Sequence, residues 1–109
     1  MGDENTRIAK TEALFREVNE TIAQTAEKFE ADEAEFVCEC AEATCTTRVP
    51  ATLDEYERVR AEPTHFLLAR GHEEDRVERV VRERKRYQVV EKVEKTVARI
   101  VTQLNPRTA

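Results

Sequence analysis

The chain has 109 residues, so we expect a single domain. Charged residues make up 38% of it and hydrophobic residues 39%, with only six aromatic side chains, so its apolar core must be small. The net charge is −5, and neither a long apolar run nor a secretory segment is present, which argues against a membrane protein and favours a cytoplasmic one.

The charge is unevenly distributed along the chain. Residues 1–45 carry twelve acidic and four basic side chains, a net charge of −8, whereas residues 76–109 carry four acidic and ten basic ones, a net charge of +6. The basic part also contains interspersed acidic residues and offers only Tyr87 for stacking on bases. We therefore do not expect a nucleic-acid partner.

Residues 6–30 have the pattern of one long amphipathic helix, uninterrupted by glycine or proline. The a and d positions of about three heptads hold Ile8, Thr11, Phe15, Val18, Ile22, Thr25 and Phe29. Two interpretations stay open. The helix either packs on the protein's own core, or pairs as a coiled coil with a protein partner or a second copy in a homodimer. On this basis we divide the chain into an N-terminal helix, residues 1–31, and a metal-stapled domain, residues 32–109.

The next elements are short. Residues 31–35 form an acidic break, and residues 36–40 read as a strand that enters a cysteine-containing loop. Residues 48–50 are the expected return strand, ended by its proline. Thr52 and Glu55 have the spacing of a capping box, which predicts a short helix that ends before Pro63.

The C-terminal half alternates strands and helices. Residues 65–69 read as a strand, followed by a turn at Gly71, the only glycine after position 2. Val77, Val80 and Val81 have helical spacing and predict a second short helix. Residues 87–91 read as a strand and residues 93–104 as a terminal helix. The fold class is therefore α+β, with a long N-terminal helix, a small antiparallel or mixed sheet and short helices.

Three cysteines, the only ones in the chain, lie within eight residues: Cys38, Cys40 and Cys45. A disulfide would leave one thiol over and is not favoured in the cytoplasm. Unrelated buried cysteines rarely gather in a polar segment. A metal site explains the CxCx4C spacing, because residues i and i+2 of a strand point to the same side and a short loop can bring the third thiolate round.

Tetrahedral Zn²⁺ takes a fourth ligand, and the chain has two histidines. We favour His72, which follows the turn glycine at a strand end, over His65 at the start of that strand. Glu73 or Glu74 would then orient the other ring nitrogen of His72. An iron–sulfur cluster is the less favoured alternative.

Four protein ligands close the site, so the metal would be structural and the protein not an enzyme. If the fourth position were open, Glu39 and Glu42 would be candidate bases. A nucleophile–base pair of Cys45 with His72 is less favoured than metal capture. No phosphate-binding loop or hydrolase motif is present in the sequence.

The segments FVCEC with Cys45, EYERVR, PTHF, GHE and YQVVEK follow one another between residues 36 and 92. This pattern resembles a group of small uncharacterised bacterial proteins with a CECx4C motif. The resemblance implies a shared fold, and it implies no activity.

From these features we expect a small zinc-binding protein-interaction or regulatory module. Its site would be structural, and its N-terminal helix would mediate association. The alternative is a redox or metal sensor in which the thiolate site is itself functional.

Overall fold

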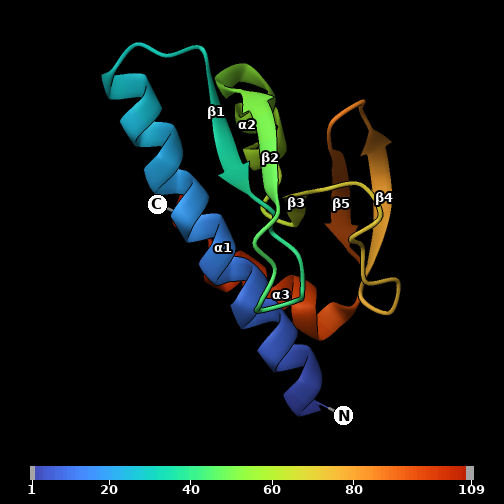
Figure 1. Ribbon diagram of the computed structural model, residues 1–109. Helices are drawn as coiled ribbons and strands as arrows, with labels where there is room; N and C mark the ends of the chain where they lie inside the picture. The colour runs from blue at the N-terminus through green and yellow to red at the C-terminus, as the bar shows by residue number, and fades with distance from the viewer. Residues whose placement is uncertain (1, 108–109) are drawn as a thin grey trace.

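The structure is a computed structural model that describes residues 2–107. A long helix lies along one side of the molecule, and two small sheets lie beside it (Figure 1). The elements, in chain order, are α1 (Gly2–Lys28), β1 (Glu33–Val37), β2 (Arg48–Thr52), α2 (Leu53–Arg60), β3 (His65–Leu68), β4 (Glu78–Glu83), β5 (Gln88–Lys92) and α3 (Lys95–Gln103).

Both sheets are antiparallel. Strands β1 and β2 form a two-stranded sheet, and the other three strands pair in the order β3–β5–β4. Helix α3 crosses behind α1, and α2 lies against the two-stranded sheet (Figure 1). The predicted α+β class is confirmed, as are the return strand, the 65–69 and 87–91 strands and the terminal helix, each within a few residues.

The capping box is also confirmed. Glu55 N–H donates to Thr52 Oγ1 at 3.0 Å, and Thr52 N–H donates to Glu55 Oε1 at 2.8 Å. These two bonds satisfy amides that the first turn of a helix leaves free. The cap fixes α2 so that Tyr56 stacks on Phe36 of β1, with ring centroids 4.5 Å apart.

Two sequence predictions were wrong. The acidic segment 31–35 is not a break, because β1 begins at Glu33 and pairs with β2 as far as Thr52, so Pro50 does not end the return strand. The segment predicted as a helix from Val77, Val80 and Val81 is strand β4. A bulge between Val80 and Arg82 shifts the register there. The bulge interrupts the alternation of inward and outward side chains along the strand. The adjacent valines therefore have a spacing that resembles that of a helix.

Helix α1 is present as predicted, but its buried face is not the predicted stripe. Of that stripe Ile8 is buried, whereas Val18 is 41% exposed and Phe29 is 80% exposed. The buried face is one made largely of small and polar residues: Ala9, Glu12, Ala13, Arg16, Asn19 and Ala23. Ile8, Ala9 and Ala23 join the hydrophobic core, so α1 packs on the protein's own core.

The buried polar residues of α1 have specific partners on other elements. The Arg16 guanidinium donates to the carbonyls of Pro63 at 2.9 Å and Val101 at 2.6 Å, and it lies over the Phe66 ring. The Lys92 ammonium also lies over that ring, 4.5 Å from its centroid; it forms an ion pair with Glu78 and lies 2.7 Å from Glu12 Oε1. Polar residues can face the core here because distant segments supply charge and hydrogen bonds.

Burial raises the pKa of Glu12 to about 9, from its usual value of 4.5. The folded chain therefore holds a proton that the unfolded chain loses, so this group's contribution to stability declines as the pH rises from about 4.5 to about 9, by at most ~1.4 kcal/mol per pH unit. We predict that Glu12→Gln flattens this decline. Urea unfolding of both proteins from pH 5 to pH 9 gives the free energy of unfolding at each pH. If this free energy declined equally steeply with pH in both, Glu12 would not be the group responsible.

Candidate metal centre

Three separate segments bring Cys38, Cys40, Cys45 and His72 together. Cys38 and Cys40 follow the last residue of β1, and Cys45 ends a turn in which its N–H donates to the Glu42 carbonyl at 3.0 Å. His72 ends a second turn, after β3. One potential ligand atom from each of the four residues lies within 4.8 Å of all the others.

The second turn shows how His72 reaches the thiols. Its N–H donates to the Ala69 carbonyl at 3.2 Å, and Gly71 has φ 84°, as the sequence predicted. A positive φ at the third position is the mark of a type II turn, which glycine adopts without strain. Any other residue at position 71 would be strained, so Gly71 helps to fix where the imidazole lies.

Two of the distances between ligand atoms match those around a tetrahedral ion. His72 Nδ1 lies 3.6 Å from Cys38 Sγ and 3.7 Å from Cys45 Sγ. Around a tetrahedral Zn²⁺, with sulfur at 2.3 Å and nitrogen at 2.0–2.1 Å, these atoms are about 3.5 Å apart. Two sulfur atoms on such an ion are about 3.8 Å apart. All four ligand atoms lie within 4.8 Å of one another, so they could close on one ion with shifts of about 1 Å.

The thiols differ in exposure and in proton affinity. Cys38 and Cys40 are buried, whereas Cys45 is half-buried and His72 is exposed. A hydrogen bond from the Cys38 thiol lowers the pKa of Cys40 to about 5, while the same bond, together with burial, raises the pKa of Cys38. Metals bind thiolates, so a bound ion would displace the proton that lies between the Cys38 and Cys40 sulfurs.

The other histidine is elsewhere. His65 Nε2 lies 3.5 Å from Glu91 Oε2, on the three-stranded sheet. The structure therefore brings His72, and not His65, to the cysteines.

The site lies where the two sheets meet. Glu39 N–H donates to the Leu67 carbonyl at 2.8 Å, and Leu67 N–H donates to Glu39 Oε1 at 2.9 Å. Ala69 N–H donates to Cys38 Sγ at 3.2 Å. A metal ion here would thus join the loop after β1 to the turn after β3.

Sequence analysis missed how Glu39 is used. Its side chain is fully buried, and it accepts hydrogen bonds from Leu67 N–H and from Asn19 Nδ2, the latter at 2.8 Å. Asn19 also pairs with the backbone of Val37, donating to its carbonyl and accepting from its N–H. Glu39 is thus a buried support of the cysteine loop and is not placed to act as a base. Its position between Cys38 and Cys40, on the opposite side of an extended chain, was the available signal.

The other acidic candidates have different partners. Glu42 accepts from the Thr44 hydroxyl at 2.9 Å and the Thr44 N–H at 3.3 Å, which shapes the cysteine loop and lowers the pKa of Glu42. Glu73 accepts from Gln88, and Glu74 pairs with Arg76. Within residues 2–107 neither of the last two is hydrogen-bonded to His72, so the predicted orienting role is not observed.

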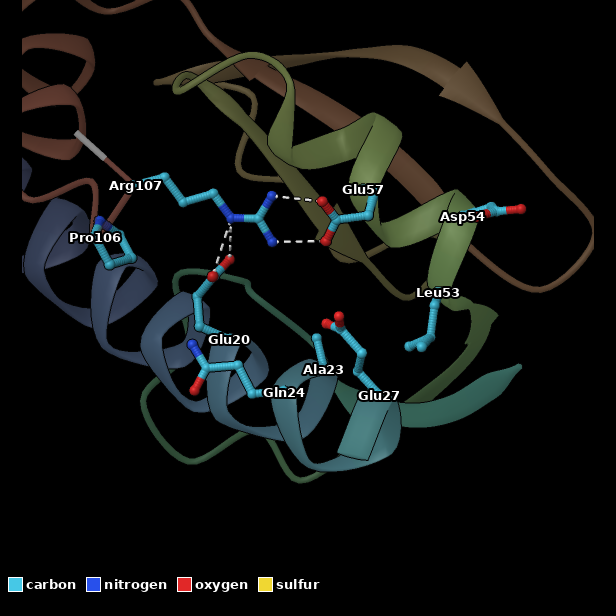
Figure 2. Close-up of a pocket in the computed structure, with 9 residues that line it drawn as sticks. All are labelled: Glu20, Ala23, Gln24, Glu27, Leu53, Asp54, Glu57, Pro106 and Arg107. Carbon is cyan, nitrogen blue, oxygen red and sulfur yellow. Dashed lines mark hydrogen bonds and ion pairs between the residues drawn. The ribbon is translucent and has the colours of Figure 1, made fainter. Parts of the chain in front are cut away.

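A second candidate is a hollow of about 630 Å³ between α1, α2 and the C-terminal residues (Figure 2). Arg107 extends across it and forms ion pairs with Glu20 of α1 and Glu57 of α2, at 3.0 and 2.7 Å. Its acidic walls are therefore partly neutralised by the protein's own arginine. Arg107 thus links the end of the described chain to both helices. The described residues that line the hollow include no cysteine or histidine.

No family model, curated protein or solved structure matches this chain. The resemblance to small bacterial proteins with a CECx4C motif therefore stays a prediction. In the part of the chain that the structure describes, no helix combines the length and apolar character needed to cross a bilayer.

Proposed function

We propose that this protein is a small zinc-binding interaction or regulatory module, not an enzyme, with a structural Cys3His site and an association surface on α1. The observation that carries the proposal is the convergence of three thiols and one imidazole, from three segments, within 4.8 Å. Such a set suits a borderline-soft ion in tetrahedral coordination, which is the usual geometry of structural zinc.

Zinc is favoured over an iron–sulfur cluster by the size of the group. In a cluster the protein ligands bind different iron atoms, with sulfide ions between them. That arrangement spreads the ligand atoms further apart than a single ion does. Nδ1 to Sγ distances of 3.6 and 3.7 Å fit one ion.

A structural role follows from the position of the group and from the size of the core. The site lies between the cysteine loop, which follows β1, and the turn that follows β3, and these two strands belong to different sheets. A chain of this length buries a modest apolar core, and metals commonly stabilise such domains. Four protein ligands also leave no open position for a reacting water.

Cobalt substitution tests the ligand set. We expect Co²⁺ added to the metal-free protein to give visible d–d bands of tetrahedral intensity, with sulfur-to-cobalt charge transfer in the near ultraviolet. His72→Ala should change the d–d bands and weaken binding by more than about 10-fold, since replacing residues that only orient metal ligands already costs that much. His65→Ala is the matched control and should leave the spectrum unchanged. A spectrum unaffected by His72→Ala would exclude His72 as a ligand.

A second candidate function is a redox or metal sensor. It is favoured by Cys45, which is only half-buried and so can be reached by an oxidant. Hydrogen peroxide would oxidise two of the thiolates to a disulfide, peroxide being reduced to water, and the metal would be released. Zinc release can be followed with a chromogenic chelator. Rapid release at micromolar peroxide would support the sensor, and a site inert to millimolar peroxide would support the structural role.

A further inference from the structure

The outer face of α1 carries a stripe of exposed residues opposite the buried face. The stripe consists of Leu14, Val18, Thr21, Thr25 and Phe29, which we call the outer stripe. Leu14 is 60% exposed and Phe29 is 80% exposed. The Phe29 N–H donates to the Thr25 carbonyl at 3.2 Å, so Phe29 continues the helical turn. Large apolar side chains that share one exposed helix face indicate an interaction surface.

The outer stripe follows a heptad spacing. Its members are separated by four, three, four and four residues, so at about 100° per residue they stay on one face of the helix. Val18, Thr25 and Phe29 also belong to the sequence-predicted stripe, whereas Leu14 and Thr21 do not. The structure has moved the candidate association face to the side of α1 that faces away from the core.

We propose that a second copy of this chain binds the outer stripe, with the two α1 helices antiparallel and related by a two-fold axis near Thr21 and Ile22. This inference rests on the association role proposed above, and it names the partner and the register. In this register Leu14 lies level with Phe29 of the second copy, and Val18 lies level with Thr25. The contact is isologous, so each apolar pair occurs twice.

In this register Phe29 of one copy lies over a socket on α1 of the other copy. Thr11, Leu14, Phe15 and Val18 have the spacing i, i+3, i+4 and i+7, which forms a knobs-into-holes socket. Thr11 and Phe15 are half-buried, and Leu14 and Val18 are exposed, so the socket is open to a partner. Phe29 of the second copy lies at the level of this socket and on the matching edge.

The charges along the opposite edge are complementary. Glu17 and Lys28 are both exposed and lie on the same edge of the outer stripe. In an antiparallel two-fold pair like edges meet, so Glu17 faces Lys28 of the second copy, twice. In a parallel pair opposite edges would meet, so Glu17 and Lys28, which share one edge, would not face each other. The charge pattern therefore favours the antiparallel arrangement.

The surface beside Glu17 also fits the lysine stem. A hollow of about 380 Å³ there is lined by Lys10, Ala13, Leu14, Glu17 and Leu104. Leu104 is 46% exposed. The methylene chain of Lys28 from the second copy can lie in this hollow while its ammonium reaches Glu17, as lysine side chains commonly do on apolar surfaces.

Multi-angle light scattering and sedimentation equilibrium of the full chain, over a wide concentration range, test the proposal. We expect the wild-type mass to rise from one copy to two. Phe29→Glu should weaken dimerisation by about 10-fold or more, because it replaces the only aromatic side chain of the outer stripe with a charge at both ends of the contact. Val93→Glu is the matched control, because Val93 is 50% exposed but lies outside the outer stripe, and it should dimerise normally.

A charge exchange tests the register. Glu17→Lys alone should weaken the dimer, because it faces Lys28 of the second copy, and Glu17→Lys with Lys28→Glu should restore it. A monomer at every concentration, a dimer indifferent to Phe29→Glu, or failure of the exchange to restore dimerisation would overturn the proposal. The metal content of each variant is measured in parallel, so loss of the zinc site is distinguished from loss of this contact.

Discussion

Cys40→Ser is expected to abolish tight metal binding and to destabilise the fold by about 3 kcal/mol or more, because structural zinc contributes its binding free energy to folding. Serine lacks the thiolate that binds the metal. Because Cys40 is buried, no water-exposed side chain can take its place as a ligand. Among residues 2–107, the cysteine loop is hydrogen-bonded to β3 through Glu39 and Leu67, and to the turn after β3 through Ala69 N–H and Cys38 Sγ, so the ion would be a large part of this junction. Urea unfolding followed by circular dichroism gives the loss.

The controls separate metal loss from local damage. Wild-type protein treated with a strong chelator should unfold at the same urea concentration as Cys40→Ser, and the chelator should have no further effect on the variant. Thr44→Ala, in the same loop but without a ligand atom, should keep the metal and lose little stability. A Cys40→Ser protein as stable as the wild type would show that the thiols do not hold a structural ion.

Lys92→Met is expected to destabilise the fold by about 3–5 kcal/mol, the usual loss when one partner of a buried ion pair is removed. Lys92 and its partners Glu12 and Glu78 have fully buried side chains. With Lys92 gone, Glu78 must be buried as an unpaired charge or take up a proton. The free energy of unfolding in urea at pH 7 measures the effect.

The matched variant removes the orphaned charge as well. Glu78→Gln combined with Lys92→Met should recover most of the lost stability, because a neutral amide is less costly to bury than a carboxylate. The recovery should grow at high pH, where the carboxylate of the single variant is hardest to protonate. A double variant no more stable than Lys92→Met would mean that the lysine acts chiefly through its packing on Phe66.

Elements set by local chemistry were predictable from the sequence. The capping box placed the start of α2, and Gly71 marked the turn that carries His72. The gathering of Cys38, Cys40, Cys45 and His72 was likewise accessible, because the CxCx4C spacing and the turn glycine indicated a shared site. The predicted strand over residues 36–40 was placed too late, since β1 spans Glu33–Val37 and both cysteines follow it.

Features that depend on distant partners were not predictable. Glu12, Arg16 and Asn19 look like surface residues of an amphipathic helix, and their burial requires Lys92, the Val101 carbonyl and Glu39, which lie far along the chain. Strand β4 was mistaken for a helix because a bulge displaces Val81, which becomes 41% exposed, and bulges leave no regular sequence period.

The metal content of the 109-residue chain, purified without added zinc and weighed intact by native mass spectrometry, tests the central claim most directly. We predict a mass increase of one zinc ion per chain in the wild type and in His65→Ala, with loss of that increase in Cys40→Ser. A wild-type chain that is folded, unfolds cooperatively and carries no metal would contradict the account.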